Sequence, residues 1–171
     1  MARTQFAAIE DRTRLRRSLT ELILDVFRLN GALLASGDAL VGDLGLTSAR
    51  WQVLGAIALS PIPLPVAHLA RNMGLTRQAV QRSVDEMRND GLVQLDPNPH
   101  HRRAMLVTMT QGGNNAYRAA SERQARWADA FARGLSPKET EAASLLMREL
   151  QRRLDPSTPI ATTVRSDKKE V

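Results

Sequence analysis

The chain has 171 residues, a formal net charge of +6 and 4% aromatic residues. A chain of this length can bury a sizeable core as one domain with terminal extensions, and its basic balance favours a polyanionic partner. It contains no cysteine, which excludes disulfides, thiolate catalysis, thiol redox sensing and cysteine metal sites.

The N-terminal part of the chain predicts two helices. Residues 1–14 should be flexible, and they lack the apolar core of a signal peptide. From residue 15 to about residue 35, apolar side chains follow a 3.6-residue period, and Ser36-Gly37-Asp38 should end this long amphipathic helix. Thr47 opens a second helix with an apolar inner face. Because no apolar run approaches the length of a membrane span, we expect a cytoplasmic protein.

Residues 65–92 predict a helix-turn-helix. Met73-Gly74-Leu75 should form the turn, since glycine adopts the positive φ that other residues resist. Thr76 is suited to N-cap the second helix, in which three apolar residues share one face at i, i+4 and i+7. The alternative interpretation is an ordinary helical hairpin within a bundle.

The polar residues of this second helix favour nucleic-acid reading. Arginines and amides lie at its N-terminal end and acids at its C-terminal end, which is opposite to what the helix dipole prefers. Arg and Gln side chains read guanine and adenine edges in the major groove. The predicted DNA-binding residues of this helix are Thr76, Arg77, Gln78, Gln81 and Arg82.

The hydrophobic period changes from helical to alternating after residue 91. Residues 92–95 and 105–109 predict two strands, joined by a loop that two prolines stiffen and whose far side is basic. A β-hairpin directly after a recognition helix makes a winged helix, so the predicted fold class is mainly α with a small β-hairpin wing. The predicted DNA contacts of the wing are His100, His101, Arg102 and Arg103.

Two further helices and a tail complete the chain. Thr110 should cap a helix that ends at Gly134. Ser136-Pro137-Lys138-Glu139 is a capping box with proline at the first helical position, and it predicts a last helix that Asp155-Pro156 stops. The tail over residues 155–171 should be disordered.

The predicted elements place a winged helix-turn-helix domain, residues 47–110, between long helices from the two ends of the chain. The flanking regions, residues 15–46 and 111–154, carry amphipathic helices with little globular body to cover. We therefore expect these helices to bury their apolar faces against a second copy of the chain, in an intertwined homodimer. A monomeric helical cap is the alternative.

Acidic residues are absent from two stretches, between Asp43 and Asp85 and between Asp96 and Glu122. These stretches contain Arg77 and Arg82 of the predicted reading helix and Arg102 and Arg103 of the wing. Local imbalance of this kind attracts phosphate more than net charge does. Double-stranded DNA is therefore the expected partner.

The order of parts over roughly residues 15–154 resembles the MarR family of bacterial transcription regulators. The matching pieces are LTSARWQVL, VAHLARNMGLTRQAVQRSVDEMRNDGLV, MLVTMT and LSPKETEAASLLMREL. The resemblance implies a dimeric, mostly helical protein that binds a palindromic operator, usually as a repressor. It also implies release from DNA by a small molecule, often aromatic and acidic, bound between the dimer helices and the reading helix.

The wing departs from the family pattern. Relatives usually carry an Asp two residues before the wing arginine, whereas this chain has His101 before Arg103. The brace of the hairpin must come from elsewhere, with Asp96 as a candidate, or be absent. Neighbouring histidines on a strand point in opposite directions and rarely ligate one ion. Solvated or phosphate-facing imidazoles fit better, and we expect no metal and no cofactor.

Without a cysteine or a metal cluster, the expected effector is a small organic molecule such as an aromatic acid or its thioester. Its cleft would lie where the first, second and fifth helices meet the reading helix. The candidates for its lining are Phe27, Trp51, Leu54, Tyr117 and Trp127, with Arg50 as an anchor for a carboxylate. The alternative for each aromatic residue is simple core packing.

Three other functions fit the sequence less well. An enzyme would need a nucleophile motif, a phosphate-binding glycine loop or a recognisable metal-ligand spacing, and the sequence contains none of these. A non-specific architectural DNA-binding protein without an effector is the main alternative, but it would not need Gln78 and Gln81 directed at base edges. A protein-interaction module of the same fold would not need an acid-free wing.

Overall fold

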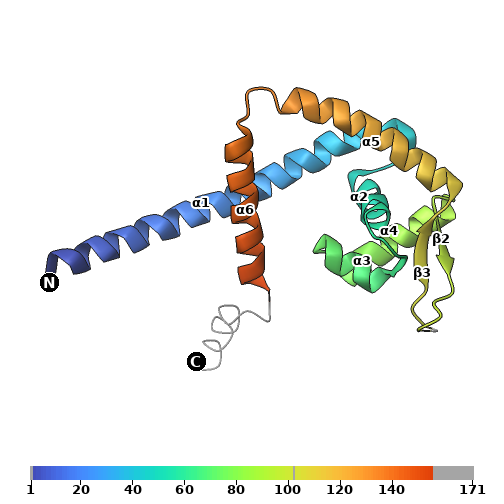
Figure 1. Ribbon diagram of the computed structural model, residues 1–171, viewed down its shortest axis with the longest axis horizontal. Helices are drawn as coiled ribbons and strands as arrows, with labels where there is room; N and C mark the ends of the chain where they lie inside the picture. The colour runs from blue at the N-terminus through green and yellow to red at the C-terminus, as the bar shows by residue number, and fades with distance from the viewer. Residues whose placement is uncertain (1, 102, 156–171) are drawn as a thin grey trace. The chain divides into compact units, whose positions relative to one another are not determined.

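The computed structural model describes residues 2–101 and 103–155, with side chains from residue 10 onward. It divides into two compact units, one reaching to Arg126 and the other beginning at Trp127. Helices dominate, and a small three-stranded antiparallel sheet accompanies them (Figure 1). The predicted fold class is confirmed. Arg102 and the predicted disordered tail beyond residue 155 lie outside the described residues.

The elements follow the predicted order, with one addition in the sheet. The first unit contains α1 (Ala2–Val41), the 3-10 helix η1 (Gly42–Leu44), α2 (Ser48–Ala58), β1 (Leu64–Pro65), α3 (Val66–Met73), α4 (Arg77–Asn89), β2 (Val93–Asp96) and β3 (Leu106–Met109). Helix α5 (Gln111–Phe131) crosses the boundary between the units, and α6 (Pro137–Leu154) belongs to the second unit.

The helix-turn-helix forms as the sequence predicts. Helix α3 ends at Gly74, which takes the left-handed conformation with φ of 65°. The Thr76 hydroxyl then accepts a hydrogen bond from the Ala79 N–H at 3.2 Å, so it N-caps α4. The apolar face of α4 is buried through Val80 and Val84, together with Met87. Burial of this face turns the polar face of α4 outward.

The sheet has the strand order β1-β3-β2. Strands β2 and β3 form the predicted antiparallel hairpin, with Val93 opposite Met109. Strand β1 pairs with the other edge of β3, with Leu64 opposite Val107. This strand was not predicted, because the prolines around it indicate a break in the chain. An edge strand tolerates Pro65 since one of its sides makes no ladder hydrogen bonds.

The core of the first unit joins α2, α3 and α4 to the sheet. A single cluster of buried apolar side chains lies there, and it also receives residues from the end of α1 and from α5. Its members are Val41, Leu46, Val53, Leu54, Val66, Leu69, Ala70, Val80, Val84, Met87, Val93, Val107 and Ala120. This core holds the recognition helix and the hairpin in one body.

Helix α1 is longer than predicted, running from Ala2 to Val41. The predicted helix end at residues 36–38 is wrong. A Cβ atom added to Gly37 would lie 2.2 Å from Ser48 Oγ, so this glycine permits a close approach of α2. The Ser48 hydroxyl donates to the Leu34 carbonyl at 2.7 Å, and the Ser48 N–H donates to Asp38 Oδ1 at 2.6 Å. Gly37 therefore marks a helix contact instead of a helix end.

The predicted signals of the last two helices are confirmed. The Thr110 hydroxyl accepts from the Gly113 N–H at 3.1 Å at the start of α5. Gly134 adopts a φ of 81° after α5 ends, and Ser136 accepts from the Glu139 N–H at 3.4 Å to cap α6. No described residue of α6 is buried.

Candidate nucleic-acid interface

The outward face of α4 is polar and exposed. Arg77, Gln78 and Arg82 are exposed there, and Gln81 is half-buried. With Asp85, Glu86 and Asn89 they line a shallow groove along the helix. The major groove of B-DNA admits one α-helix, and an exposed polar helix face is what its base edges can contact.

Two of the predicted reading residues already have partners within the helix. The Gln81 side-chain amide donates to Asp85 Oδ1 at 3.1 Å, and the Thr76 hydroxyl oxygen serves the helix N-terminus. Arg77, Gln78 and Arg82 are therefore the exposed members of the predicted set on the first two turns, while Thr76 fixes where the helix begins.

The loop of the wing is organised by Asn98. Its side-chain oxygen accepts from the His100 N–H at 3.0 Å, and its amide donates to the Ala104 carbonyl at 3.0 Å. The His101 N–H also donates to the Asn98 carbonyl at 3.2 Å. These contacts close the loop and leave His100, His101 and Arg103 exposed at its outer side. These three candidate residues of the wing are thus held together on one short loop.

Asp96, the candidate brace of the hairpin, accepts from the Thr108 hydroxyl at 2.6 Å and from the Gln94 amide at 3.2 Å, so it braces the stem between β2 and β3. The loop itself is held by Asn98, which was not singled out in the sequence. The signal for Asn98 was its place between two prolines, because asparagine side chains commonly mimic a backbone turn in such loops.

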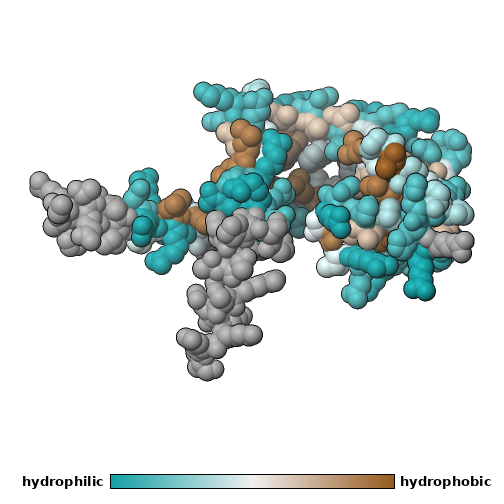
Figure 2. Space-filling model, turned by 60° about the horizontal axis from the view of Figure 1, so that its bottom comes forward, coloured by the Kyte–Doolittle hydropathy of each residue, from teal (hydrophilic) through white to brown (hydrophobic). Residues whose placement is uncertain are grey.

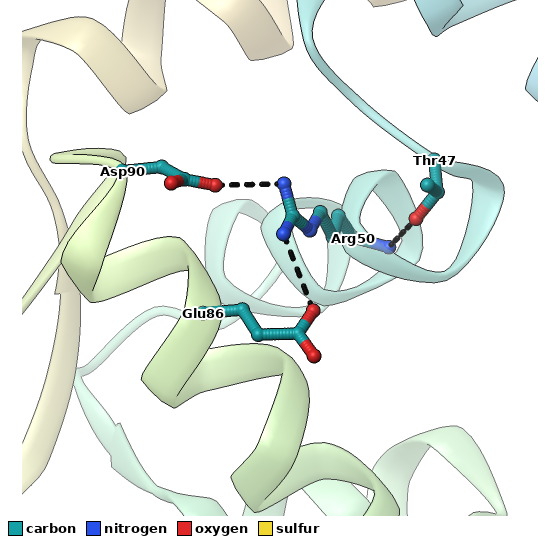
Figure 3. A network of polar contacts seen from close by, with 4 residues as sticks. All are labelled: Thr47, Arg50, Glu86 and Asp90. Carbon is teal, nitrogen blue, oxygen red and sulfur yellow. Dashed lines mark hydrogen bonds and ion pairs between the residues drawn. The ribbon is translucent and has the colours of Figure 1, made fainter.

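The acids at the C-terminal end of α4 have a structural partner on α2. Arg50 Nη1 donates to Asp90 Oδ2 at 2.8 Å, and Arg50 Nη2 donates to Glu86 Oε2 at 3.2 Å (Figure 3). The Arg50 N–H in turn donates to the Thr47 hydroxyl at 3.3 Å, which caps α2. The unusual order of charges along α4 therefore reflects a link between two helices as well as a basic N-terminal end.

The predicted ligand-binding residues lie in different environments. Leu54 has 0% exposure and belongs to the core, whereas Phe27 on α1 is 68% exposed. Trp51 and Tyr117 are half-buried and pack against the core. In the second unit, Trp127 stacks on the Phe131 ring with the ring centroids 4.8 Å apart. The prediction that Leu54 lines a ligand cleft is not supported by this placement, because its side chain is enclosed by other apolar residues.

An ion pair and a hydrogen bond connect α5 to η1 and to the end of α1. Arg123 binds both carboxylate oxygens of Asp43, with Nη2 and Oδ2 2.8 Å apart, and also donates to the Leu40 carbonyl at 3.0 Å. The hydrogen bond from Arg123 holds the pKa of the Asp43 carboxyl below its ordinary value.

Within residues 2–101 and 103–155, no group of three or more potential metal-ligating side chains is placed to hold an ion. Within the same ranges, no helix combines the length and apolarity needed to cross a bilayer.

The fold and the exposed face of α4 define a winged helix-turn-helix protein of the DNA-binding class. A sequence model of the MarR family matches residues 44–104. The uncharacterized protein Rv2011c of Mycobacterium tuberculosis is 33% identical over 132 residues, which cover 77% of this chain and 91% of that protein. The chain belongs to the MarR family, and it is a DNA-binding transcription regulator, not an enzyme.

Two solved structures share its fold. The Mycobacterium tuberculosis regulator MosR, crystallised in complex with DNA, has a TM-score of 0.61 and 24% identity. The match covers 74% of this chain and 93% of the MosR chain. The regulator PcaV of Streptomyces coelicolor, in complex with its natural ligand, has a TM-score of 0.67 and 24% identity. The match covers 76% of this chain and 91% of the PcaV chain. Both similarities concern the fold.

Proposed function

We propose that this regulator is a homodimeric repressor in the cytoplasm that binds a palindromic operator and is released by a small organic ligand. The proposal assigns DNA binding to residues 47–110 and dimerisation to residues 15–46 and 111–154. The observation that carries it is the outward face of α4, where Arg77, Gln78 and Arg82 stand exposed beside the closed, basic loop of the wing.

The two parts of this surface have different roles in the proposal. Arg77, Gln78 and Arg82 occupy the first two turns of α4 and reach base edges. Gln81 also contacts a base, after its hydrogen bond to Asp85 is replaced by one to the base edge. His100, His101, Arg102 and Arg103 of the wing contact the backbone or the minor groove, where charge matters and sequence does not.

Alanine substitution separates these roles. Gln78→Ala, Gln81→Ala or Arg82→Ala should each cost on the order of 1–3 kcal/mol on the preferred site and relax base preference locally. Arg102→Ala and Arg103→Ala should weaken binding to all duplexes and lower the salt slope by roughly one unit. Both are measured by titrating operator and random duplexes at several salt concentrations.

A matched control is Gln124→Ala, which removes an exposed glutamine of α5 and should change neither quantity. Unchanged base preference in all three α4 variants would contradict the assignment of α4 as the reader. Unchanged affinity and salt slope in the arginine variants would show that the wing is not at the DNA. An architectural DNA-binding protein would show no base preference in any form.

The proposed homodimer rests on two apolar helix faces. Helix α1 leaves Leu15 69% and Phe27 68% exposed, and brown apolar side chains interrupt the teal ones along it (Figure 2). Helix α6 leaves Leu145 63% exposed and also exposes Leu146 and Leu154. Apolar side chains so exposed along two helices favour burial against a second copy.

Removal of residues 136–171 tests this dimer. The truncated chain should lose half-site pairing and self-association together, as measured by sedimentation and by binding to one-site and two-site duplexes. A truncated chain that stays monodisperse, monomeric and tight on a palindrome would contradict the dimer assignment.

The proposed ligand is an aromatic acid or its thioester. The half-buried Trp51 and Tyr117 offer aromatic surface in the first unit, and Arg50 already binds carboxylates of this chain. A ligand changes DNA binding only if it binds the DNA-incompetent state more tightly. A panel of such acids should give both a thermal shift and release of operator DNA. Release by peroxide or a divalent metal alone would contradict this part.

A further inference from the structure

Arg50 joins α2 to the half of α4 that lies away from the proposed base-reading residues. Its guanidinium reaches Glu86 and Asp90, which are one helical turn apart, and its side chain is only 20% exposed (Figure 3). Both acids are about half exposed. Two carboxylates bound by one planar guanidinium fix the direction of α4 relative to α2 as well as the distance between them, because guanidinium hydrogen bonds require a defined geometry.

The core and Arg50 constrain α4 in different ways. Val80, Val84 and Met87 hold one face of α4 on the core, and the ion pairs of Arg50 add a second constraint at the C-terminal end whose geometry is directional. Helix α4 has 13 residues and is therefore about 20 Å long. A tilt of about 5° around the end held by Arg50 would move its first turn by about 1.5 Å, more than a base hydrogen bond tolerates.

The first turn of α2 is anchored on its other side to α1. Ser48 is 4% exposed, and it donates its N–H to Asp38 and its hydroxyl to the Leu34 carbonyl. Gly37 permits this approach, since a Cβ atom there would meet the Ser48 hydroxyl. Within residues 48–50, α2 is thus bound to α1 and to α4 by polar contacts of fixed geometry.

We propose that Arg50 is a positioning residue for DNA reading, which sets the orientation of α4 by binding Glu86 and Asp90 from a turn of α2 that is itself fixed to α1. The proposal rests on the proposed function in one respect, namely that α4 reads the bases. Arg50 itself touches no base in this role. Its effect is on the discrimination between operator and random DNA.

Two substitutions of opposite charge test this role. Arg50→Gln removes a positive charge, whereas Asp90→Asn removes a negative charge, and each breaks the contact at 2.8 Å. Both should reduce the ratio of operator affinity to random-duplex affinity, by on the order of tenfold for Arg50→Gln. A residue acting only by charge would instead change both affinities in the same direction, downward for Arg50→Gln and upward for Asp90→Asn.

A matched control removes another arginine ion pair. Arg28→Gln breaks the exposed contact of Arg28 with Asp25 on α1, at 2.9 Å. Arg28 lies in the proposed dimerisation region, so self-association is checked by sedimentation, and with self-association unchanged the affinity ratio should be unchanged. Affinities are measured with the full chain well below the unfolding midpoint of each variant. Glu86→Gln and the reversed pair Arg50→Glu with Glu86→Arg extend the test, and the reversed pair should recover part of the ratio that Arg50→Glu alone loses.

The outcomes separate this inference from the proposed function. If Gln78→Ala and Arg82→Ala relax base preference but the Arg50 and Asp90 variants leave the affinity ratio unchanged, the positioning role is refuted and the reading role stands. If none of the α4 variants alters base preference, the proposed function itself fails. A fall of the ratio in Arg50→Gln, Glu86→Gln and Asp90→Asn alike supports the positioning role.

Discussion

Gly113 in the first turn of α5 leaves no room for a larger residue. A Cβ atom added there would lie 2.0 Å from the Leu92 carbonyl oxygen and 3.0 Å from its carbon. The same carbonyl accepts hydrogen bonds from the Thr110 N–H at 3.1 Å and from the Thr110 hydroxyl at 3.2 Å. Because the obstacle is backbone, no side-chain rotation can relieve the contact.

Gly113→Ala should therefore destabilise the protein by about 2–4 kcal/mol. Carbon and oxygen approach to about 3.3 Å at closest, so the backbone must move by more than about 1 Å. Overpacking of this kind costs about 1–3 kcal/mol, and each weakened hydrogen bond costs about 1 kcal/mol. Alanine returns at most about 1 kcal/mol through its helix preference.

Thermal unfolding at fixed protein concentration measures the effect. At roughly 2–4 °C per kcal/mol, Gly113→Ala should lower the midpoint by on the order of 10 °C. Gly112→Ala is the matched control in the same turn, since its Cβ would lie 3.4 Å from the Gly91 carbonyl oxygen, an ordinary contact. Equal midpoints for the two variants would refute the close approach of α5 to the hairpin.

Two further predictions concern the wing and the ion pair of α5. Asn98→Ala removes two hydrogen bonds of the loop and should weaken DNA binding by about 1–3 kcal/mol with little change in unfolding midpoint. If the variant bound DNA as tightly as the wild type, Asn98 would not be the residue that holds the wing loop for DNA binding. Asp43 has a lowered folded pKa through Arg123, so its stabilisation is present above its ordinary value of 3.8 and is lost as the pH falls through the folded value. The stability difference between wild type and Asp43→Asn should thus shrink below that pH, and a constant difference would contradict the pairing.

Helix caps and hydrophobic periodicity, which are local features of the sequence, predicted most of the fold. Thr76, Gly74 and Ser136 act at the helix ends that their side chains or backbone freedom predict. Such signals are readable because the cap and its partner lie within a few residues. The period of the apolar residues likewise predicted the buried face of α4.

Contacts between distant residues explain what the sequence did not reveal. Gly37 was interpreted as a helix stop because glycine often ends helices. Its contact with Ser48 on another helix cannot be seen in the local sequence. Arg50 was predicted to bind a ligand carboxylate, yet in the structure its partners are Glu86 and Asp90, which are 36 and 40 residues away. The edge strand β1 depends on its pairing with β3, which local propensity does not encode. Leu54 was predicted to line a ligand cleft, whereas in the structure its side chain is part of the core.

Selection of binding sites from random duplex DNA by the full chain tests most directly whether α4 reads an operator. We expect one enriched sequence with two-fold symmetry, whose half-sites are separated by about one helical turn, or 10–10.5 base pairs from centre to centre. Gln78→Ala or Arg82→Ala should lose enrichment at defined positions in each half-site. A selected pool with no enriched sequence, bound only as tightly as random DNA, would contradict an operator-reading α4.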